Sequence, residues 1–340
     1  QMYVTGGIGS TVLGEAFTVD YDLPNATVYA ETCASIGLIF FARRMLQLEA
    51  KGEYADVMER ALYNTVLAGM QLDGKRFFYC NPLEVVPGIS GKAATQRHVD
   101  PQRPAWYACA CCPPNVARLL SSIGSYAYGE GEKAFFIHLY LGGAVKSSQG
   151  WSLSCETDYP RQGTARFTFH GQAEAALAFH IPSWSAQTCL RVNGEEQDLG
   201  ALLQDGYAYV ARSYGEGDVI ELSFDMAPYK VYATSRVPAD TGCAAVQRGP
   251  VVYCAEGVDN GGDVLSLSLR EGGALWEKPY DPDLLGGIVP LVAEGWQAKP
   301  TEELYTRQRP PREAADIRLV PYYTWGNRGE NQMRVWLPEN

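Results

Sequence analysis

The sequence predicts an α+β protein of several domains, with helices in the first third and antiparallel β-sandwiches in the remainder. Apolar residues recur near a 3.6-residue spacing before about residue 130, whereas short alternating or β-branched runs separated by Gly, Asp and Pro follow it. The length of 340 residues exceeds the chain length at which a single hydrophobic core usually stops growing. We therefore expect two or three domains.

Three long helices are predicted in the first third of the chain. They span residues 32–50, residues 53–72 and a segment that begins at Pro113-Pro114 and continues to Ile123. Proline suits a first turn because its missing N–H would have no helical partner there. A stretch punctuated by Gly and Pro, residues 73–103, separates the second and third helices, and its length indicates a functional loop or short strands.

The β-region is predicted to form two sandwiches. Runs such as F-F-I-H-L-Y-L, A-R-F-T-F-H and V-I-E-L-S-F follow one another between turn residues. Val192-Asn193-Gly194 predicts a hairpin turn, and a break at residues 226–228 separates the two sandwiches. The predicted domains are residues 1–128, 129–226 and 227–340.

Charge and hydropathy exclude two classes of partner. The net charge of −11 argues against nucleic acid, which needs a concentrated basic surface. The longest apolar run, residues 36–42, is too short to span a bilayer. We therefore expect neither nucleic-acid nor membrane binding, and carbohydrate or other neutral ligands remain open.

The nine cysteines predict free thiols rather than a disulfide framework. Their number is odd and their spacing is not that of a small secreted scaffold. A reducing compartment suits them better, and because the chain shows no basic-then-apolar leader, the prediction of a cytoplasmic location rests on cysteine usage alone.

The segment C-A-C-C-P-P-N, residues 109–115, carries the strongest chemical signal. Cys111 and Cys112 stand just before a predicted helix, where unpaired amides and the helix dipole favour a thiolate. Upstream, Y-A-E-T-C supplies Glu31 and Cys33, so that one carboxylate and three sulfurs are available for a four-coordinate zinc site. Metal binding, nucleophilic catalysis and plain packing of buried cysteines all remain open from these residues alone.

The spacing of Glu31 and Cys33 sets a condition on this site. Residues i and i+2 of a regular helix point to nearly opposite sides. The two side chains can therefore converge only if the helix begins at or after them, and Thr32 as a cap with Ser35 behind it is compatible with that condition.

Glu15 is a candidate general acid. It follows the glycine-rich T-G-G-I-G-S segment in G-E-A-F-T, and burial among apolar neighbours would raise its pKa. A solvated loop glutamate is the alternative. The glycine run lacks the lysine and the strand–loop–helix frame of a phosphate-binding loop. Of the histidines, His98 lies in the long loop, and three lie in predicted strands with structural or surface roles: His138, His170 and His180.

Several motifs, in order along the chain, resemble glycoside hydrolase family 127, the β-L-arabinofuranosidases. They are Y-V-T-G-G-I-G-S, G-E-A-F-T, Y-D-L-P-N, Y-A-E-T-C-A, Y-C-N-P-L and A-C-C-P-P-N, followed by I-P-S-W, V-N-G and Q-R-G-P-V-V-Y in the β-region. The resemblance covers nearly the whole chain, and the combination of Glu-x-Cys with Cys-Cys is its most specific part.

The resemblance implies a retaining hydrolase with a zinc-bound cysteine nucleophile. By motif, Cys111 would attack the anomeric carbon and Glu15 would serve as general acid and base. Tyr79 of Y-C-N-P-L would contact the substrate, and Cys109 receives no role. The zinc ligands implied in this way are Glu31, Cys33, Cys111 and Cys112.

The resemblance also implies a fold: part of an (α/α)6 barrel followed by two antiparallel β-sandwich domains. Only three long helices are evident here, so we expect the N-terminal half of the barrel to be missing from this chain and its substrate pocket to be incomplete. A homodimer is expected from the exposed sandwich faces. The alternative function is a non-catalytic, zinc-stabilised protein that binds carbohydrate or a partner subunit.

Overall fold

The computed structural model describes residues 1–106 and 108–340. The protein is a mixed α/β chain of more than one unit. One compact unit comprises Gln1–Ile36, Ala61–Val116 and Ala227–Asn340, and the other comprises Gly37–Arg60 and Ala117–Met226. None of the helices in these residues combines the length and apolar character needed to cross a membrane.

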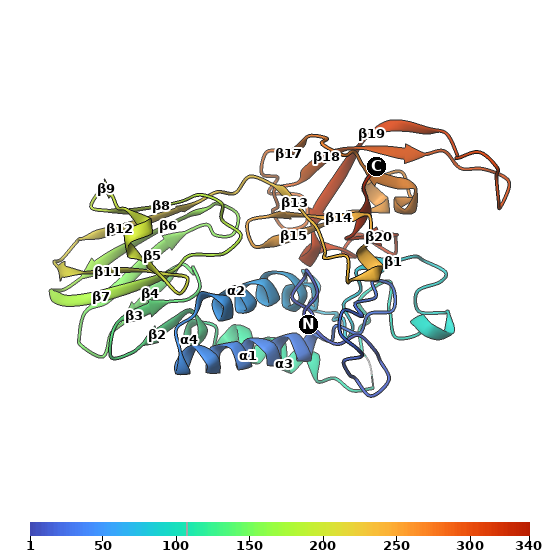
Figure 1. The fold of residues 1–340 in the computed structure, drawn as a ribbon. Helices are drawn as coiled ribbons and strands as arrows, with labels where there is room; N and C mark the ends of the chain where they lie inside the picture. The colour runs from blue at the N-terminus through green and yellow to red at the C-terminus, as the bar shows by residue number, and fades with distance from the viewer. Residues whose placement is uncertain (107) are drawn as a thin grey trace. The chain divides into compact units, whose positions relative to one another are not determined.

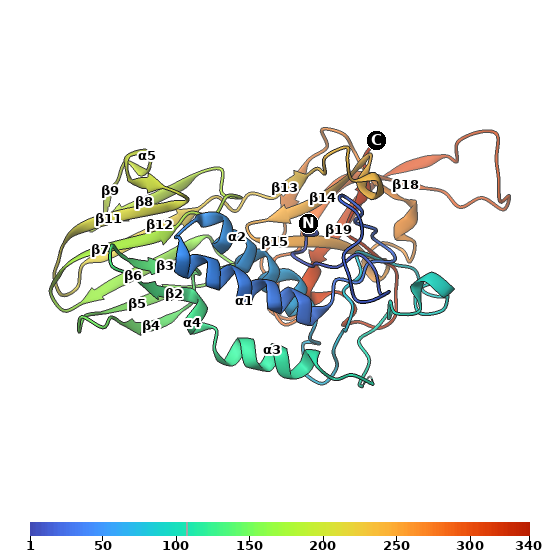
Figure 2. The ribbon, with the colours of Figure 1, turned by 60° about the horizontal axis from the view of Figure 1, so that its bottom comes forward.

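The long helices begin where the sequence predicts them. The described helices are α1 (Thr32–Leu48), α2 (Gly52–Ala61), α3 (Cys112–Ser121) and α4 (Gly124–Ala127), labelled in Figure 1, and α5 (Leu199–Leu202), labelled in Figure 2. The second predicted helix differs in one respect, because α2 passes into a π-helical turn over Leu62–Val66. All five residues of that turn are buried, and its Asn64 side chain bonds to Pro250 O and Val252 N at 2.9 and 2.8 Å.

The second unit contains a five-stranded and a six-stranded sheet, visible in green and yellow in Figure 1. Their orders are β10-β11-β7-β3-β2 and β4-β5-β6-β12-β8-β9. The strands are β2 (Tyr128–Glu130), β3 (Phe135–Ile137), β4 (Gly143–Lys146), β5 (Ser152–Thr157), β6 (Thr164–His170), β7 (Ala173–His180), β8 (Thr188–Val192), β9 (Glu195–Glu196), β10 (Leu203–Gln204), β11 (Tyr207–Tyr214) and β12 (Val219–Phe224).

Two pairings in these sheets bear on the sequence predictions. The predicted hairpin is confirmed: β8 and β9 pair across Asn193 and Gly194, whose φ angles of 52° and 83° suit a tight hairpin turn. The expectation of purely antiparallel sheets is wrong at one place, because β3 pairs with β7 in parallel.

Helix α2 is attached to the sheets of its unit by two carboxylates. Glu59, which is 1% exposed, accepts hydrogen bonds from the Tyr159 hydroxyl and from Trp184 Nε1, the latter at 2.8 Å. Asp56 Oδ1 lies 3.1 Å from His180 Nε2 and accepts a bond from Ser183 N. Because buried carboxylates need such partners, the I-P-S-W segment has a structural role here.

The first unit contains a ten-stranded sheet, shown mainly in orange and red in Figure 2. Its central path is β1-β20-β15-β19-β18-β16. The strands are β1 (Glu84–Val85), β13 (Tyr229–Val231), β14 (Cys243–Arg248), β15 (Val251–Glu256), β16 (Leu267–Leu269), β17 (Leu275–Glu277), β18 (Leu291–Ala298), β19 (Arg312–Pro321), β20 (Met333–Arg334) and β21 (Leu337–Pro338). Short 3-10 turns also occur, and one of them (Ala94–Gln96) lies with β1 inside the long loop of residues 73–103, as expected.

N-terminal and C-terminal segments share the core of this unit. Phe78 stacks on Trp325 with ring centroids 4.7 Å apart, and the guanidinium of Arg103 lies 4.5 Å from the Phe78 ring centroid. Arg103 is 2% exposed and donates to Ala68 O and Trp325 O at 2.9 and 2.6 Å. Strand β1 adds Glu84 opposite Arg334. Phe78 is therefore fixed in the core, and residues 79–81 follow it directly in the chain.

Candidate metal centre

Glu31 is held by the backbone of residues 79–81. Thr32 N donates to Tyr79 O at 2.9 Å, Asn81 N donates to Ala30 O at 3.2 Å, and Glu31 forms an isolated antiparallel bridge with Cys80. Ala30 has a φ of 38°, in the left-handed region. The chain therefore turns sharply just before Glu31, and α1 begins at the next residue.

The side chain of Asn81 reinforces this turn from inside the unit. Its Nδ2 donates to Ala30 O and to Thr32 Oγ1, both at 2.9 Å, and Asn81 is fully buried. The Thr32 hydroxyl donates in turn to Phe78 O at 2.9 Å, so it ties α1 to residues 78–81. Helix α1 begins at Thr32, so the predicted condition holds for Glu31, which precedes the helix, but not for Cys33, which is its second residue. The two side chains converge because Glu31 lies on the bridged segment outside the helix.

Cys111 and Cys112 lie at the start of α3, as the prolines predict. Cys112 is the first residue of the helix, Pro113 and Pro114 occupy its first turn, and Asn115 N donates to Cys111 O at 3.2 Å. Cys112 is fully buried and Cys111 is half-buried. Both thiols therefore stand where helical N–H groups are still unpaired.

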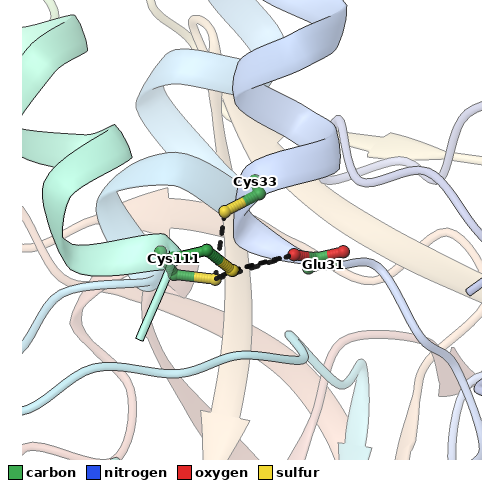
Figure 3. Close-up of side chains that lie close together, drawn as sticks. Glu31, Cys33 and Cys111 are labelled. Atoms are coloured by element: carbon green, nitrogen blue, oxygen red, sulfur yellow. Dashed lines mark hydrogen bonds between the residues drawn. The ribbon is translucent and has the colours of Figure 1, made fainter. Parts of the chain in front are cut away.

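The structure brings Glu31, Cys33, Cys111 and Cys112 together, and Figure 3 shows the labelled side chains pointing toward one another. One ligand atom from each lies within 4.8 Å of all the others. The sulfurs of Cys33 and Cys112 are 3.3 Å apart, and those of Cys111 and Cys112 are 3.8 Å apart. Glu31 Oε1 lies 3.6 Å from Cys111 Sγ and 3.9 Å from Cys112 Sγ.

These distances fit a tetrahedral ion. Zn–S bonds of about 2.3 Å and Zn–O bonds of about 2.1 Å place neighbouring ligand atoms roughly 3.6 to 3.8 Å apart at tetrahedral angles. A disulfide would need sulfurs about 2.0 Å apart, and all nine cysteines are free. Three sulfurs with one carboxylate is also a donor set that suits zinc. This group can hold a metal ion.

The electrostatics of the cluster also call for a cation. Hydrogen bonding from Cys112 is the main cause that lowers the pKa of Cys33 to about 7, whereas burial raises the pKa of Cys111 to about 12. The pKa of Cys112 is raised, first by its bond to Cys33 and then by burial. Without a cation, therefore, the cluster favours one thiolate and disfavours three. Glu31 is 8% exposed and forms no ion pair within the described residues, and a buried carboxylate normally needs a compensating charge.

Glu15 lies at the tip of a loop closed by a bridge between Thr11 and Ala16. The loop tip is exposed, so Glu15 is the solvated loop glutamate of the two alternatives and is not buried among apolar neighbours. Glu15 has a φ of 51° after Gly14 at 71°. The Tyr79 hydroxyl donates to Glu15 Oε1 at 3.0 Å, and the same hydroxyl lies within hydrogen-bonding contact of Cys111. Tyr79 therefore links the candidate acid to the sulfur cluster.

Three family models match the chain in order. Residues 1–125 match "Beta-L-arabinofuranosidase, GH127 catalytic domain", residues 134–226 match the GH127 middle domain, and residues 228–338 match the glycoside hydrolase family 127 C-terminal domain. The chain belongs to glycoside hydrolase family 127.

Relatives in this family agree with that assignment. A non-reducing end β-L-arabinofuranosidase of Bifidobacterium longum subsp. longum is 42% identical over 99% of the chain and 53% of its own length. A solved GH127 β-L-arabinofuranosidase from Geobacillus stearothermophilus T6 is 46% identical with a TM-score of 0.96, over 100% of this chain and 55% of that one. Another solved GH127 β-arabinofuranosidase is 35% identical with a TM-score of 0.90, over 100% of this chain and 54% of that one. This chain thus spans about half the length of the GH127 proteins it matches.

The remaining residues singled out from sequence lie outside the cluster. Cys109 is exposed and is not one of the four grouped residues. His98 Nε2 lies 3.2 Å from both Thr27 O and Val28 O, which is a structural contact. His138 and His180 are buried in the second unit, and His170 contacts Ser154 and Glu216.

Two asparagines of this GH127 chain were missed as site residues. Asn81 fixes the turn before Glu31, and Asn115 Nδ2 donates to Cys33 Sγ at 3.0 Å. Both stand inside the motifs that carry the family resemblance, Y-C-N-P-L and A-C-C-P-P-N. The available signal was their position two to four residues from a predicted ligand or contact residue.

Proposed function

We propose that this chain carries the nucleophile and the metal site of a retaining glycoside hydrolase that cleaves β-L-arabinofuranosides or a related furanoside. The observation that carries the proposal is the contact of one hydroxyl, that of Tyr79, with both Glu15 and Cys111. An acid and a nucleophile within reach of the same small group can act on two atoms of one glycosidic bond. The relatives' activity supports the choice of substrate.

Zinc is the proposed ion, with Glu31, Cys33, Cys111 and Cys112 as its ligands. The donor set and the ligand separations support it. When bound, zinc would keep the coordinating thiols deprotonated at neutral pH. Asn81 and the backbone of residues 79–81 hold Glu31 in the position that this site requires.

In the proposed reaction Cys111 and Glu15 act in two displacements. First, the Cys111 sulfur attacks the anomeric carbon, a C–S bond forms, the glycosidic C–O bond breaks, and Glu15 gives its proton to the departing oxygen. Second, the Glu15 carboxylate removes a proton from water, whose oxygen attacks the same carbon and displaces the sulfur. Two inversions at one carbon retain its configuration. Tyr79 donates to the Glu15 carboxylate, and we propose that it also contacts the sugar.

The finer architecture is also a proposal. We infer that residues 1–128 form the C-terminal part of an (α/α)6 barrel, and that residues 129–226 and 227–340 form two β-sandwich domains. The three family matches, which change near residues 130 and 227, support these limits. Free thiols at every cysteine support a reducing, cytoplasmic location.

A second candidate function is a non-catalytic zinc site that stabilises a carbohydrate- or partner-binding protein. One observation favours it: four protein ligands make a closed coordination shell, which is typical of structural zinc. A structural ion needs no proton donor nearby. The role of Glu15 therefore separates the two candidates.

The test is Glu15→Gln in the protein at the length of its relatives, assayed on an aryl β-L-arabinofuranoside. We expect turnover to fall by about 10² to 10⁴-fold with zinc content unchanged, because proton transfer is lost and the ligands are not. Added azide, which attacks carbon without losing a proton, should restore part of the rate. Glu132→Gln, at an exposed glutamate of the second unit, is the matched control and should behave as wild type. Full activity in Glu15→Gln would favour the structural candidate.

A further inference from the structure

We propose that Asn115 is a positioning residue that keeps Cys33 bound to the metal as the sulfur ligand that does not react. It does so by donating a side-chain hydrogen bond to Cys33 Sγ. This inference rests on the proposed function, because it assumes that the four grouped donors share an ion.

The contact is set by the first turn of α3. Asn115 N donates to Cys111 O at 3.2 Å, which places its side chain one turn beyond the Cys111-Cys112 pair. From there Nδ2 reaches Cys33 Sγ, near the start of α1, at 3.0 Å. Pro113 and Pro114 fix the backbone between the thiols and Asn115. The amide is therefore carried on the same rigid turn as two of the ligands.

An amide N–H is a suitable group for this task. It donates a proton that it cannot lose at physiological pH, so it always favours the charged form of the sulfur it faces. Donation also draws electron density from that sulfur and fixes the side-chain torsion of its cysteine. Both effects make Cys33 a better anchored ligand and a poorer nucleophile. Partners of this kind outside the ligand shell typically change metal affinity by about 10 to 100-fold.

The three sulfurs are distinguished by their surroundings. Cys33 accepts the Asn115 amide, and Cys112 is fully buried. Cys111 lies within hydrogen-bonding contact of the Tyr79 hydroxyl, which also donates to Glu15 Oε1 at 3.0 Å. Cys33 and Cys111 are both half-buried, and within the described residues Cys111 accepts no side-chain amide hydrogen bond. The arrangement directs reactivity to Cys111 by restraining Cys33.

The experiment compares wild type with Asn115→Leu, which keeps the size of the side chain and removes the donor, and with Asn115→Asp, which replaces the donor with a carboxylate. Asn327→Leu is the matched control, because Asn327 is a half-buried amide of the same unit whose contacts are with backbone groups. Zinc affinity is measured by competition with a chromophoric chelator. Alkylation of zinc-loaded protein by iodoacetamide is quantified by peptide mass spectrometry, with exposed Cys109 as internal reference.

We expect Asn115→Leu to weaken zinc binding by at least about tenfold and to raise labelling of Cys33 relative to Cys109. Asn115→Asp should weaken it further, and Asn327→Leu should change neither quantity. Wild-type affinity and labelling in Asn115→Leu would overturn the inference alone. Weaker binding without a change in Cys33 labelling would also overturn it, because packing would then explain the effect. A wild-type chain that binds no zinc would overturn the proposed function and this inference together.

Discussion

The sulfur of Cys33 lies 3.3 Å from the sulfur of Cys112, although the two residues are 79 positions apart in the chain. This separation is too long for a disulfide and close to that of two ligands on one tetrahedral ion. Two helix starts, those of α1 and α3, create the contact. The site therefore depends on where these helices begin.

Replacement of Cys111 and replacement of Cys109 should have different effects on turnover. Cys111→Ser should lower turnover by about 10³-fold or more, because the attacking thiolate is removed. Cys109→Ser should leave turnover unchanged, since Cys109 is exposed and outside the cluster. Steady-state kinetics on the same aryl furanoside gives both values. Equal losses in the two variants would contradict the assignment of Cys111.

The Tyr79 hydroxyl should matter for the rate more than for folding. Tyr79→Phe removes the 3.0 Å bond to Glu15 and keeps the ring, so we expect kcat to fall by roughly 10 to 100-fold with little change in thermal stability. Tyr3→Phe is the control, because it removes the hydroxyl of a buried tyrosine of the same unit that donates to Pro24 O at 3.2 Å and not to Glu15. A wild-type kcat in Tyr79→Phe would show that Glu15 is positioned without it.

Two glycines should respond in opposite directions to alanine. A Cβ on Gly7 would lie 2.8 Å from the Cβ of Ala30, the left-handed residue before Glu31, so Gly7→Ala should destabilise the protein by about 1 to 3 kcal/mol and weaken metal binding. Gly37, on α1, has open space around it. Gly37→Ala should therefore stabilise by about 0.5 to 1 kcal/mol.

Thermal unfolding and chelator competition measure these two effects. A Gly7→Ala protein with wild-type stability and affinity would mean that the turn at Ala30 yields easily, and the constraint on Glu31 would then be weaker than its geometry indicates.

Acid should lower the free energy of unfolding of the second unit, because His138 is buried there in its neutral form. Burial lowers the pKa of His138 to about 3, and its Nδ1 lies 2.7 Å from the Tyr207 hydroxyl. The folded pKa is below that of the unfolded chain, so the unfolded state binds the extra proton. The stability from neutral His138 is thus present above about pH 6.5 and is lost, at up to about 1.4 kcal/mol per pH unit, as pH falls toward 3.

Chemical denaturation at several pH values tests this expectation. His138→Gln, which cannot titrate, should flatten the fall in unfolding free energy between about pH 6.5 and pH 5. His170→Gln removes a more exposed histidine and should leave the slope in place. An unchanged slope in His138→Gln would show that other groups determine the acid sensitivity.

The residues of the candidate metal site could be predicted because each half of the site lies in a short stretch of sequence next to a helix start. Glu31 and Cys33 flank a helix start, and Cys111 and Cys112 precede two prolines, so each half of the site is readable from local sequence. That the halves form one site was one hypothesis from their donor set, with packing and catalysis left open, and the family resemblance then implied it. Whether Glu15 is buried or solvated stayed open from the sequence, because burial depends on segments distant in sequence.

Other features depend on tertiary contacts that local patterns do not encode. The parallel pairing of β3 with β7 leaves no mark in either strand, since alternation is the same in both orientations. Strand β1 is two residues long, too short for an alternation pattern, and it pairs with β20 in the unit where Phe78 stacks on Trp325. The direction of the Asn115 side chain likewise follows from the placement of α1 beside the start of α3.

The central claim is that one ion is shared by Glu31, Cys33, Cys111 and Cys112. X-ray absorption at the zinc edge of the reconstituted protein tests it most directly, because it counts and identifies the ligand atoms. We predict one zinc per chain with three sulfurs at about 2.3 Å and one oxygen at about 2.0 to 2.2 Å. A spectrum with only nitrogen or oxygen neighbours, or an unchanged spectrum when Glu31→Gln and Cys33→Ser are introduced together, would contradict the account.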